Sequence, residues 1–170
     1  MLMTHYMELL ATNQPWNLLI FMAVPVILAE TIAITELYLL FTRNVHTWVK
    51  TLSRIAGGIA GVYFLGVTLY LLQVAVIPLT TSRGWRGIAD VVAVGSYLLG
   101  VVPLGAITLL ELGVVGAKYD EETRMKWHAL WVGVFLIVAH IAMIFGMLNP
   151  TILGYQAPVE GQPLQQEMGM

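Results

Sequence analysis

Four ionisable residues stand inside long apolar runs of this 170-residue chain, and their types permit proton or cation chemistry. They are Glu30, Glu36, Glu111 and His140. At a rise of about 1.5 Å per residue, Glu36 and Glu111 each lie about 9 Å inside their apolar runs. On the same scale, Glu30 and His140 each lie about 18 Å inside theirs. The spacing therefore predicts two layers of ionisable groups, Glu36 with Glu111 and, deeper, Glu30 with His140.

Two carboxylates at one depth of a membrane permit three kinds of chemistry. If Glu36 and Glu111 face each other in a low dielectric, they cannot both ionise cheaply, so the pair is expected to hold a proton. With Glu30 and His140, they could instead bind a divalent cation through oxygen and imidazole ligands. The third interpretation is a buried network in which protonated glutamates fix the helix register. Because ionisable residues inside membrane spans are functional by default, we expect a proton, cation or cofactor role.

A second set of candidate ligands consists of soft donor groups, which favour soft metal ions. His140, Met143 and Met147 recur at one face of a helix, and thioether and imidazole groups favour Cu(I). Residues 1–7 add Met and His, and residues 168–170 add Met, at the two chain ends. The Met-x-x-x-Met spacing and the Met/His tail resemble motifs of the high-affinity copper importers, which have three spans rather than four. That resemblance implies copper binding, whereas methionines that merely fill gaps between helices are the alternative.

Haem is the other cofactor that this set could bind. Only His140 is deep, because His46 and His128 are expected near the ends of the apolar runs as solvated loop residues. A haem would therefore need a His140–Met pair or a second copy of the chain. The chain has no cysteine, no Glu-x-x-His pair and no phosphate-binding or nucleophile motif, so we expect no catalytic residues and no conventional enzyme.

The elements that must position these residues are membrane-spanning helices. Hydrophobic residues make up 58% of the chain and charged residues only 11%, whereas a soluble domain has about 25% charged residues. Four apolar runs, at about 16–41, 55–78, 88–117 and 127–152, are each long enough to cross a bilayer. The sequence predicts an all-α, four-helix transmembrane bundle. Its single domain would cover residues 1–156, with a flexible tail at 157–170.

Small residues on the second run predict where helices approach closely. Gly57 and Gly61 form a Gly-x-x-x-Gly spacing, which lets two backbones pack against each other in a membrane. Such glycines usually serve helix packing alone.

The basic residues predict the orientation. Of eight Lys and Arg residues, six lie in the first and third loops, two in the middle loop and none in the tails. The positive-inside rule places the first and third loops in the cytoplasm and both termini outside an inner or plasma membrane. Residues 4–13 could form a short interfacial helix. A net charge of −2 argues against nucleic acid as a partner.

The two halves of the chain share a pattern. Residues 31–37 align with 106–112, which pairs Glu36 with Glu111, and a similar offset pairs Pro78 with Pro150. This suggests two tandem hairpins related by a pseudo-two-fold axis along the membrane normal.

We therefore expect a small transporter or permease-like protein that binds a proton or cation through buried carboxylates. The alternative is a haem-bearing, copper-bearing or structural subunit of a membrane complex. For a chain of 18.7 kDa, we expect the lipid bilayer and either a homodimer or a heteromeric membrane partner.

Overall fold

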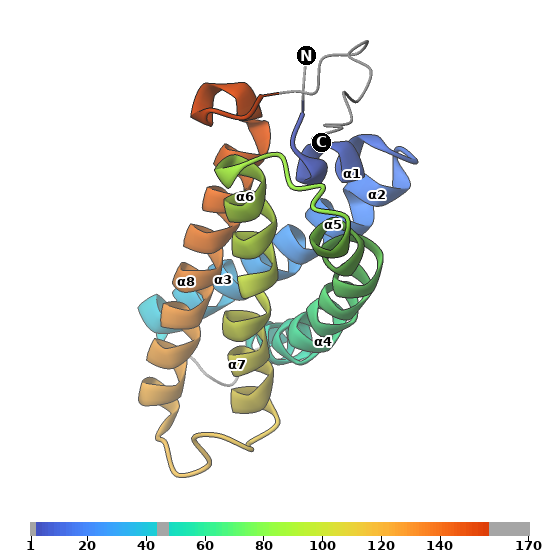
Figure 1. Cartoon of the computed structure of the whole chain (residues 1–170). Helices are drawn as coiled ribbons and strands as arrows, with labels where there is room; N and C mark the ends of the chain where they lie inside the picture. The colour runs from blue at the N-terminus through green and yellow to red at the C-terminus, as the bar shows by residue number, and fades with distance from the viewer. Residues whose placement is uncertain (1–2, 44–47, 157–170) are drawn as a thin grey trace, which may run out of the picture.

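The computed structural model describes residues 3–43 and 48–156, and every regular element in these two ranges is a helix (Figure 1). Four helical segments are long and apolar enough to cross a membrane, with mean hydropathies between 1.9 and 2.3. They are Trp16–Thr42, Trp48–Thr81, Ile88–Glu111 and Glu121–Met147. The predicted all-α bundle with four spans is confirmed, and the chain is a membrane protein.

The first two spans each contain one turn of π-helix followed by a proline. The first is α2 (Trp16–Leu18), π-helix η1 (Leu19–Ala23) and α3 (Val24–Thr42), and the second is α4 (Trp48–Leu71), π-helix η2 (Leu72–Val76) and α5 (Ile77–Thr81). Pro25 and Pro78 are the second residues of α3 and α5. Because proline has no N–H, it leaves the carbonyl four residues earlier without its helical partner. The Tyr97 hydroxyl donates to that carbonyl of Phe21 at 2.5 Å.

The third span is broken at Gly100, between α6 (Ile88–Leu99) and α7 (Val101–Glu111). A Cβ atom at Gly100 would lie 3.1 Å from the rings of both Phe64 and Phe135. These two rings meet edge to face at the centre of the bundle, with centroids 5.8 Å apart. Glycine at this position therefore lets the aromatic core close around the break.

The fourth span, α8 (Glu121–Met147), begins where a side-chain cap fixes it. The Asp120 carboxylate accepts the Thr123 N–H at 3.3 Å, and hydrogen bonds from Thr123 lower the pKa of Asp120. The helix starts six residues before the predicted boundary at 127, because its first turns carry charged residues that the hydropathy of a span does not include. The second long helix starts at Trp48, before the predicted span at 55, and the third ends at Glu111, before the predicted end at 117. The start of α8 at Glu121 places His128 two turns inside that helix.

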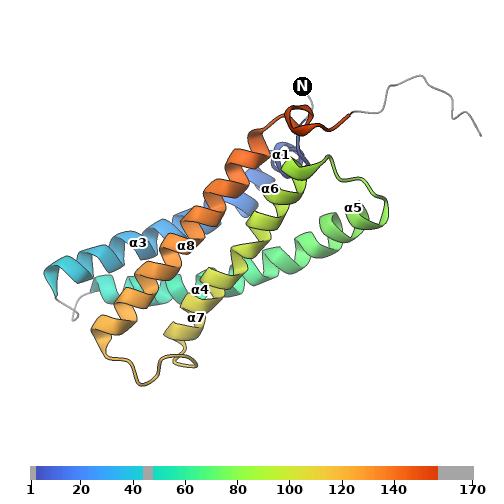
Figure 2. The same cartoon turned by 60° about the vertical axis from the view of Figure 1, so that its left-hand side comes forward.

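The four spans form a ring in which each packs on two neighbours (Figures 1 and 2). α3 lies between α4 and α8, and α7 lies between α4 and α8 on the other side. The α4–α7 contact is very close, since a Cβ atom at Gly61 would lie 2.6 Å from Leu104 O. The Thr108 hydroxyl donates to Gly57 O at 2.7 Å and accepts the Gly61 N–H at 3.0 Å. The predicted Gly-x-x-x-Gly seam is thus present, whereas the pseudo-two-fold relation stays a prediction.

The two ends of the bundle differ. The C-terminal ends of α3 and α7 lie at the His128 end, and the α1 end carries the short helix α1 (His5–Ala11) and residues 82–87. Helix α1 packs on α6 and α8 with Tyr6 and Leu10 buried, and its place at a membrane interface stays a prediction. The 3-10 helix η3 (Pro150–Leu153) follows α8 at the same end. The predicted tail at 157–170 lies outside the described residues.

Candidate functional site

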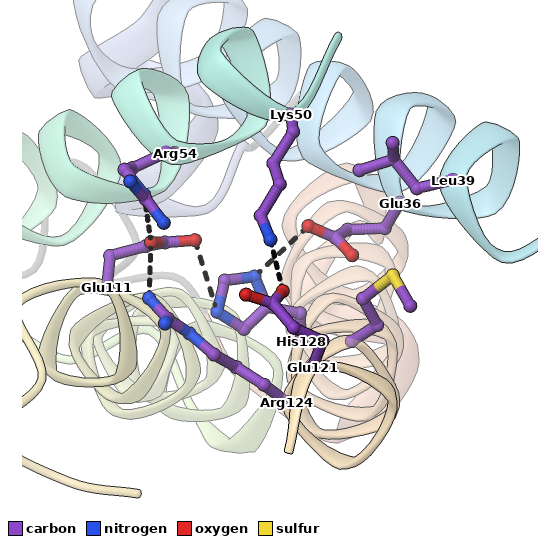
Figure 3. A pocket seen from close by; sticks show the side chains of 9 residues that line it. Glu36, Leu39, Lys50, Arg54, Glu111, Glu121, Arg124 and His128 are labelled. Atoms are coloured by element: carbon purple, nitrogen blue, oxygen red, sulfur yellow. Dashed lines mark hydrogen bonds and ion pairs between the residues drawn. The ribbon is translucent and has the colours of Figure 1, made fainter. Parts of the chain in front are cut away.

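Three ionisable side chains from three spans meet at the His128 end of the bundle (Figure 3). Glu36 comes from α3, Glu111 from α7 and His128 from α8, and we call them the triad. His128 Nδ1 lies 3.4 Å from Glu36 Oε1, and His128 Nε2 lies 3.5 Å from Glu111 Oε1. His128 is 1% exposed and Glu36 is 5% exposed. One buried imidazole therefore stands between two carboxylates.

The helical period brings these residues inward. On α8, His128 begins the buried stripe that continues through Val132 and Phe135 at intervals of four and three residues. On α3, Glu36 belongs to the buried face that also includes Ile32 and Leu39. Each polar side chain thus occupies a position that packing would otherwise give to an apolar residue.

The hydrogen bonds of the triad are incomplete. Glu36 Oε1 accepts from Ser53 Oγ at 2.5 Å. Three other buried atoms of the triad have no hydrogen-bond partner among the described residues: Glu36 Oε2 and the two ring nitrogens of His128. A neutral imidazole has one donor and one acceptor nitrogen. Between two ionised carboxylates, its acceptor nitrogen would face a second acceptor. One additional proton, on the ring or on a carboxyl group, would convert that repulsion into a hydrogen bond.

The basic side chains around the triad favour one side of it. Glu111 Oε2 accepts from Arg124 Nη2 at 2.8 Å and lies 3.3 Å from Arg54 Nε, so two guanidinium groups neutralise this carboxylate. By contrast, the ion-pair partner of Glu36 within the described chain is His128. An ionised carboxylate that is buried without a cation is costly. Within the described residues, the contact between Glu36 and His128 is therefore the side of the triad without a Lys or Arg partner.

A second ion pair covers the triad. Lys50 at the start of α4 pairs with Glu121 at the start of α8. Beneath it, the triad lines a cavity of about 20 Å³, which has room for about one water molecule or ion. In this conformation the site accommodates a proton or a small ion but no organic substrate.

The triad also has donor atoms that could hold a metal ion, since one ligand atom from each residue lies within 4.8 Å of the others. A metal ion there would compete with Arg54 and Arg124, which already neutralise the charge of Glu111.

A known protein family matches most of the chain, including this site. The model of a family of unknown function, DUF6803, matches residues 1–162, which include all four spans and the triad. The chain belongs to DUF6803. No curated protein matches the chain, and no solved structure matches it.

In this DUF6803 protein, the predicted residues separate into two groups. Glu36 and Glu111 come to the same imidazole, and their role as a proton, cation or metal site stays a prediction. Glu30 and His140, the predicted deeper layer, are both exposed on the outside of the bundle, and their role also stays a prediction. Six residues separate Glu30 from Glu36 and twelve separate His128 from His140. Each interval turns the side chain by about 120° around the helix, away from the buried face.

The soft ligands lie outside the bundle as well. His140 Nδ1 lies 2.6 Å from Leu136 O of its own helix, Met147 is exposed and Met143 is half-buried. A haem or copper ion bound there would face lipid or another subunit, and that role stays a prediction. Of the chain ends invoked for copper, residues 1–2 and 168–170 lie outside the described residues, as does His46.

His128 is the site residue that sequence reasoning missed. A fourth apolar run that begins at 127 predicts a solvated loop residue at this position, whereas the helix begins at Glu121. The signal that could have found it is the stripe His128, Val132, Phe135, which has helical spacing and continues into the core. In the sequence, Arg54 and Arg124 count only toward the orientation and Ser53 gives no signal, because their contacts with the carboxylates connect segments far apart along the chain.

Proposed function

We propose that this DUF6803 protein is a small, permease-like membrane transporter whose activity is linked to protons through the triad. The observation that carries the proposal is His128, which is buried between Glu36 and Glu111 with both ring nitrogens lacking hydrogen bonds within the described residues. A group in this situation gains a hydrogen bond when a proton arrives. Proton binding and the packing around the ring are therefore coupled.

A purely structural network is the main rival, and hydrogen bonding disfavours it. Buried polar groups that serve structure are almost always hydrogen-bonded, because an unsatisfied group costs about 1–3 kcal/mol. The triad keeps three unsatisfied atoms in one place. Such a cost is expected where a site must change state during function.

The ion pairs around the triad supply a route from proton binding to helix movement. Arg54 on α4 and Arg124 on α8 both contact Glu111 on α7, and Lys50 on α4 pairs with Glu121 on α8. If a proton changes the position of the imidazole, these pairs must adjust across three spans. A proton shifts an equilibrium when a site has two arrangements of unequal proton affinity.

The proposed orientation places the triad near the cytoplasm. Six of the eight basic residues belong to the His128 end, so the positive-inside rule puts this end inside an inner or plasma membrane and both termini outside. The six are Arg43, Lys50, Arg54, Lys118, Arg124 and Lys126.

Proteoliposomes test the proposal with a panel of candidate cations. Vesicles containing the protein and a pH-sensitive dye would receive outward gradients of Na⁺, K⁺, Mg²⁺, Mn²⁺ and small organic cations, one at a time. We expect at least one gradient to drive proton movement that is lost in His128→Gln and kept in His140→Gln. The control replaces the same residue type on the same helix, but at an exposed position.

Two outcomes would overturn the proposal. If no gradient and no imposed membrane potential moves protons through the protein, the transport function is wrong. If a divalent cation crosses while the internal pH stays constant, the triad binds that cation instead of a proton.

A further inference from the structure

The α1 end of the bundle is closed by the N-terminal segment, residues 4–11, which we call the plug. Thr4, Tyr6 and Leu10 are buried against the spans. The Thr4 hydroxyl donates to Gly146 O at 2.6 Å, near the end of α8. The Tyr6 ring fills the space over Gly146, where a Cβ atom would lie 2.5 Å from Tyr6 Cδ1. The seat of the plug is thus shaped by one particular side chain.

A buried carboxylate holds the plug in place. Asp90, at the start of α6, is 0% exposed and accepts three N–H groups. They are the His5 backbone N–H at 2.7 Å, His5 Nδ1 at 2.6 Å and the Arg86 backbone N–H at 3.2 Å. Arg86 in turn donates to Met3 O at 2.6 Å and pairs with Glu8 at 2.7 Å. We call His5, Arg86 and Asp90 the latch.

The plug depends on the latch because it is too short to be stable alone. Helix α1 has seven residues, and isolated helices shorter than about 12–15 residues are marginal in water. His5 and Arg86 are each 22% exposed at their side chains, so solvent reaches the outer side of the latch. The plug joins the first span through residues 12–15, and its release would leave all four spans intact. It is therefore the easiest part of the α1 end to open.

Beneath the plug, aromatic side chains close the interior. Ring centroids are 5.5 Å apart between Tyr6 and Tyr97, 5.2 Å between Tyr97 and Phe64, and 5.8 Å between Phe64 and Phe135. This chain of rings runs from the plug to the break at Gly100. Aromatic side chains can rotate and open such a closure without movement of a span. The plug is therefore the part of the backbone that closes the α1 end.

We propose that the plug is the gate at the α1 end, which must leave its seat before the triad can exchange protons with that side of the membrane. This inference rests on the proposed function, because a gate needs a site to serve. Alternating exposure of one site to two sides requires closure at each end in turn. The ion pair between Lys50 and Glu121 covers the triad at the other end.

Cysteine accessibility tests the gate, and the chain suits this method because it contains no cysteine. Val94→Cys supplies a reporter one turn below Asp90 on α6, at a buried position. A membrane-impermeant methanethiosulfonate would be added from the α1 side. Release of the latch in His5→Ala/Arg86→Gln should speed labelling about tenfold, because charge-assisted hydrogen bonds are lost. Arg83→Gln, in the same loop, should leave the rate unchanged. An unchanged labelling rate in the double variant would overturn the proposal that the plug is a gate.

The connection to the triad is tested by passive proton entry into proteoliposomes. We expect His5→Ala/Arg86→Gln to admit protons several-fold faster than the parent, and additional Glu36→Gln to remove that increase. If proton entry stays fast with Glu36→Gln, the plug seals the bundle without gating the triad, and the inference is wrong. Labelling of the Val94→Cys reporter does not depend on the triad, so failure of the proposed function would leave the accessibility result standing.

Discussion

A histidine faces a buried carboxylate at each end of this bundle, and the two ends differ in how they use it. At the α1 end, Asp90 accepts three N–H groups, including His5 Nδ1 at 2.6 Å. At the His128 end, the ring nitrogens lie 3.4 and 3.5 Å from Glu36 and Glu111 and form no hydrogen bond with any described residue. An imidazole and a carboxylate thus make a complete network at one end and an incomplete one at the other.

Under the proposed function, complete hydrogen bonding marks the structural network and incomplete hydrogen bonding marks the functional one. A complete network loses stability when any member is removed, because the remaining groups stay buried and unpaired. An incomplete network loses little stability and instead has room to take up a proton. The comparison predicts opposite effects of matched substitutions at the two ends.

The largest expected effect on stability is at Asp90. Asp90→Asn replaces an acceptor by an NH₂ group that faces N–H donors, so we expect a loss of about 2–3 kcal/mol in the free energy of unfolding. Glu36→Gln, the matched change in the triad, should alter it by less than about 1 kcal/mol, since it removes a buried charge that lacks a Lys or Arg partner among the described residues. Unfolding in mixed micelles would measure both. Equal losses of stability at the two positions would contradict the proposed difference between the two ends.

The next effect concerns the seam that brings Glu111 to the triad. In Gly61→Ala, the new methyl group would overlap Thr108 Oγ1 and lie 2.6 Å from Leu104 O, so we expect a loss of about 2 kcal/mol. The control Gly58→Ala meets nothing within 4 Å and should change stability by about 0.5 kcal/mol or less. Hydrogen exchange should show the loosening of α7 at the His128 end, with the plug unchanged. Loosening of both ends together would contradict the separation.

The smallest effect lies between the two ends. Tyr97→Phe removes a buried hydroxyl that donates to Phe21 O, the carbonyl that Pro25 leaves free, and should cost about 1 kcal/mol. Tyr63→Phe removes a more exposed hydroxyl that donates to Ile20 O at 2.9 Å, and should cost about half as much. Thermal unfolding in nanodiscs would compare them. The reverse order would show that burial does not set the value of these hydrogen bonds.

The sequence was sufficient for the fold because hydropathy and length determine membrane spans. The four spans follow from runs of apolar residues, whose burial in lipid does not depend on which helices are their neighbours. The close seam at Gly57 and Gly61 also follows from a local pattern. The helix ends differ from the predicted span ends by up to seven residues, because charged turns such as the first turn of α8 remain helical when their side chains pair with one another.

The site was only half predictable, for a geometric reason. Depth along a helix can be counted from the sequence, and the count brings Glu36 and Glu111 to one layer. The direction of a side chain around the helix depends on which face meets the neighbours, and this direction turns Glu30 and His140 outward. His128 was missed because its depth depends on a helix start six residues before the apolar run. Contacts between Ser53 and Glu36 join different spans, so no local pattern reports them.

The most direct test of the central claim is the charge displaced when the pH is stepped over protein reconstituted on a solid-supported membrane. Proton binding at a site within the membrane produces a transient current that needs no substrate. We predict a clear transient in the parent, its loss in His128→Gln and Glu36→Gln, and an unchanged transient in the exposed controls His140→Gln and Glu30→Gln. A transient of the same size in His128→Gln would contradict the claim that the triad holds an exchangeable proton.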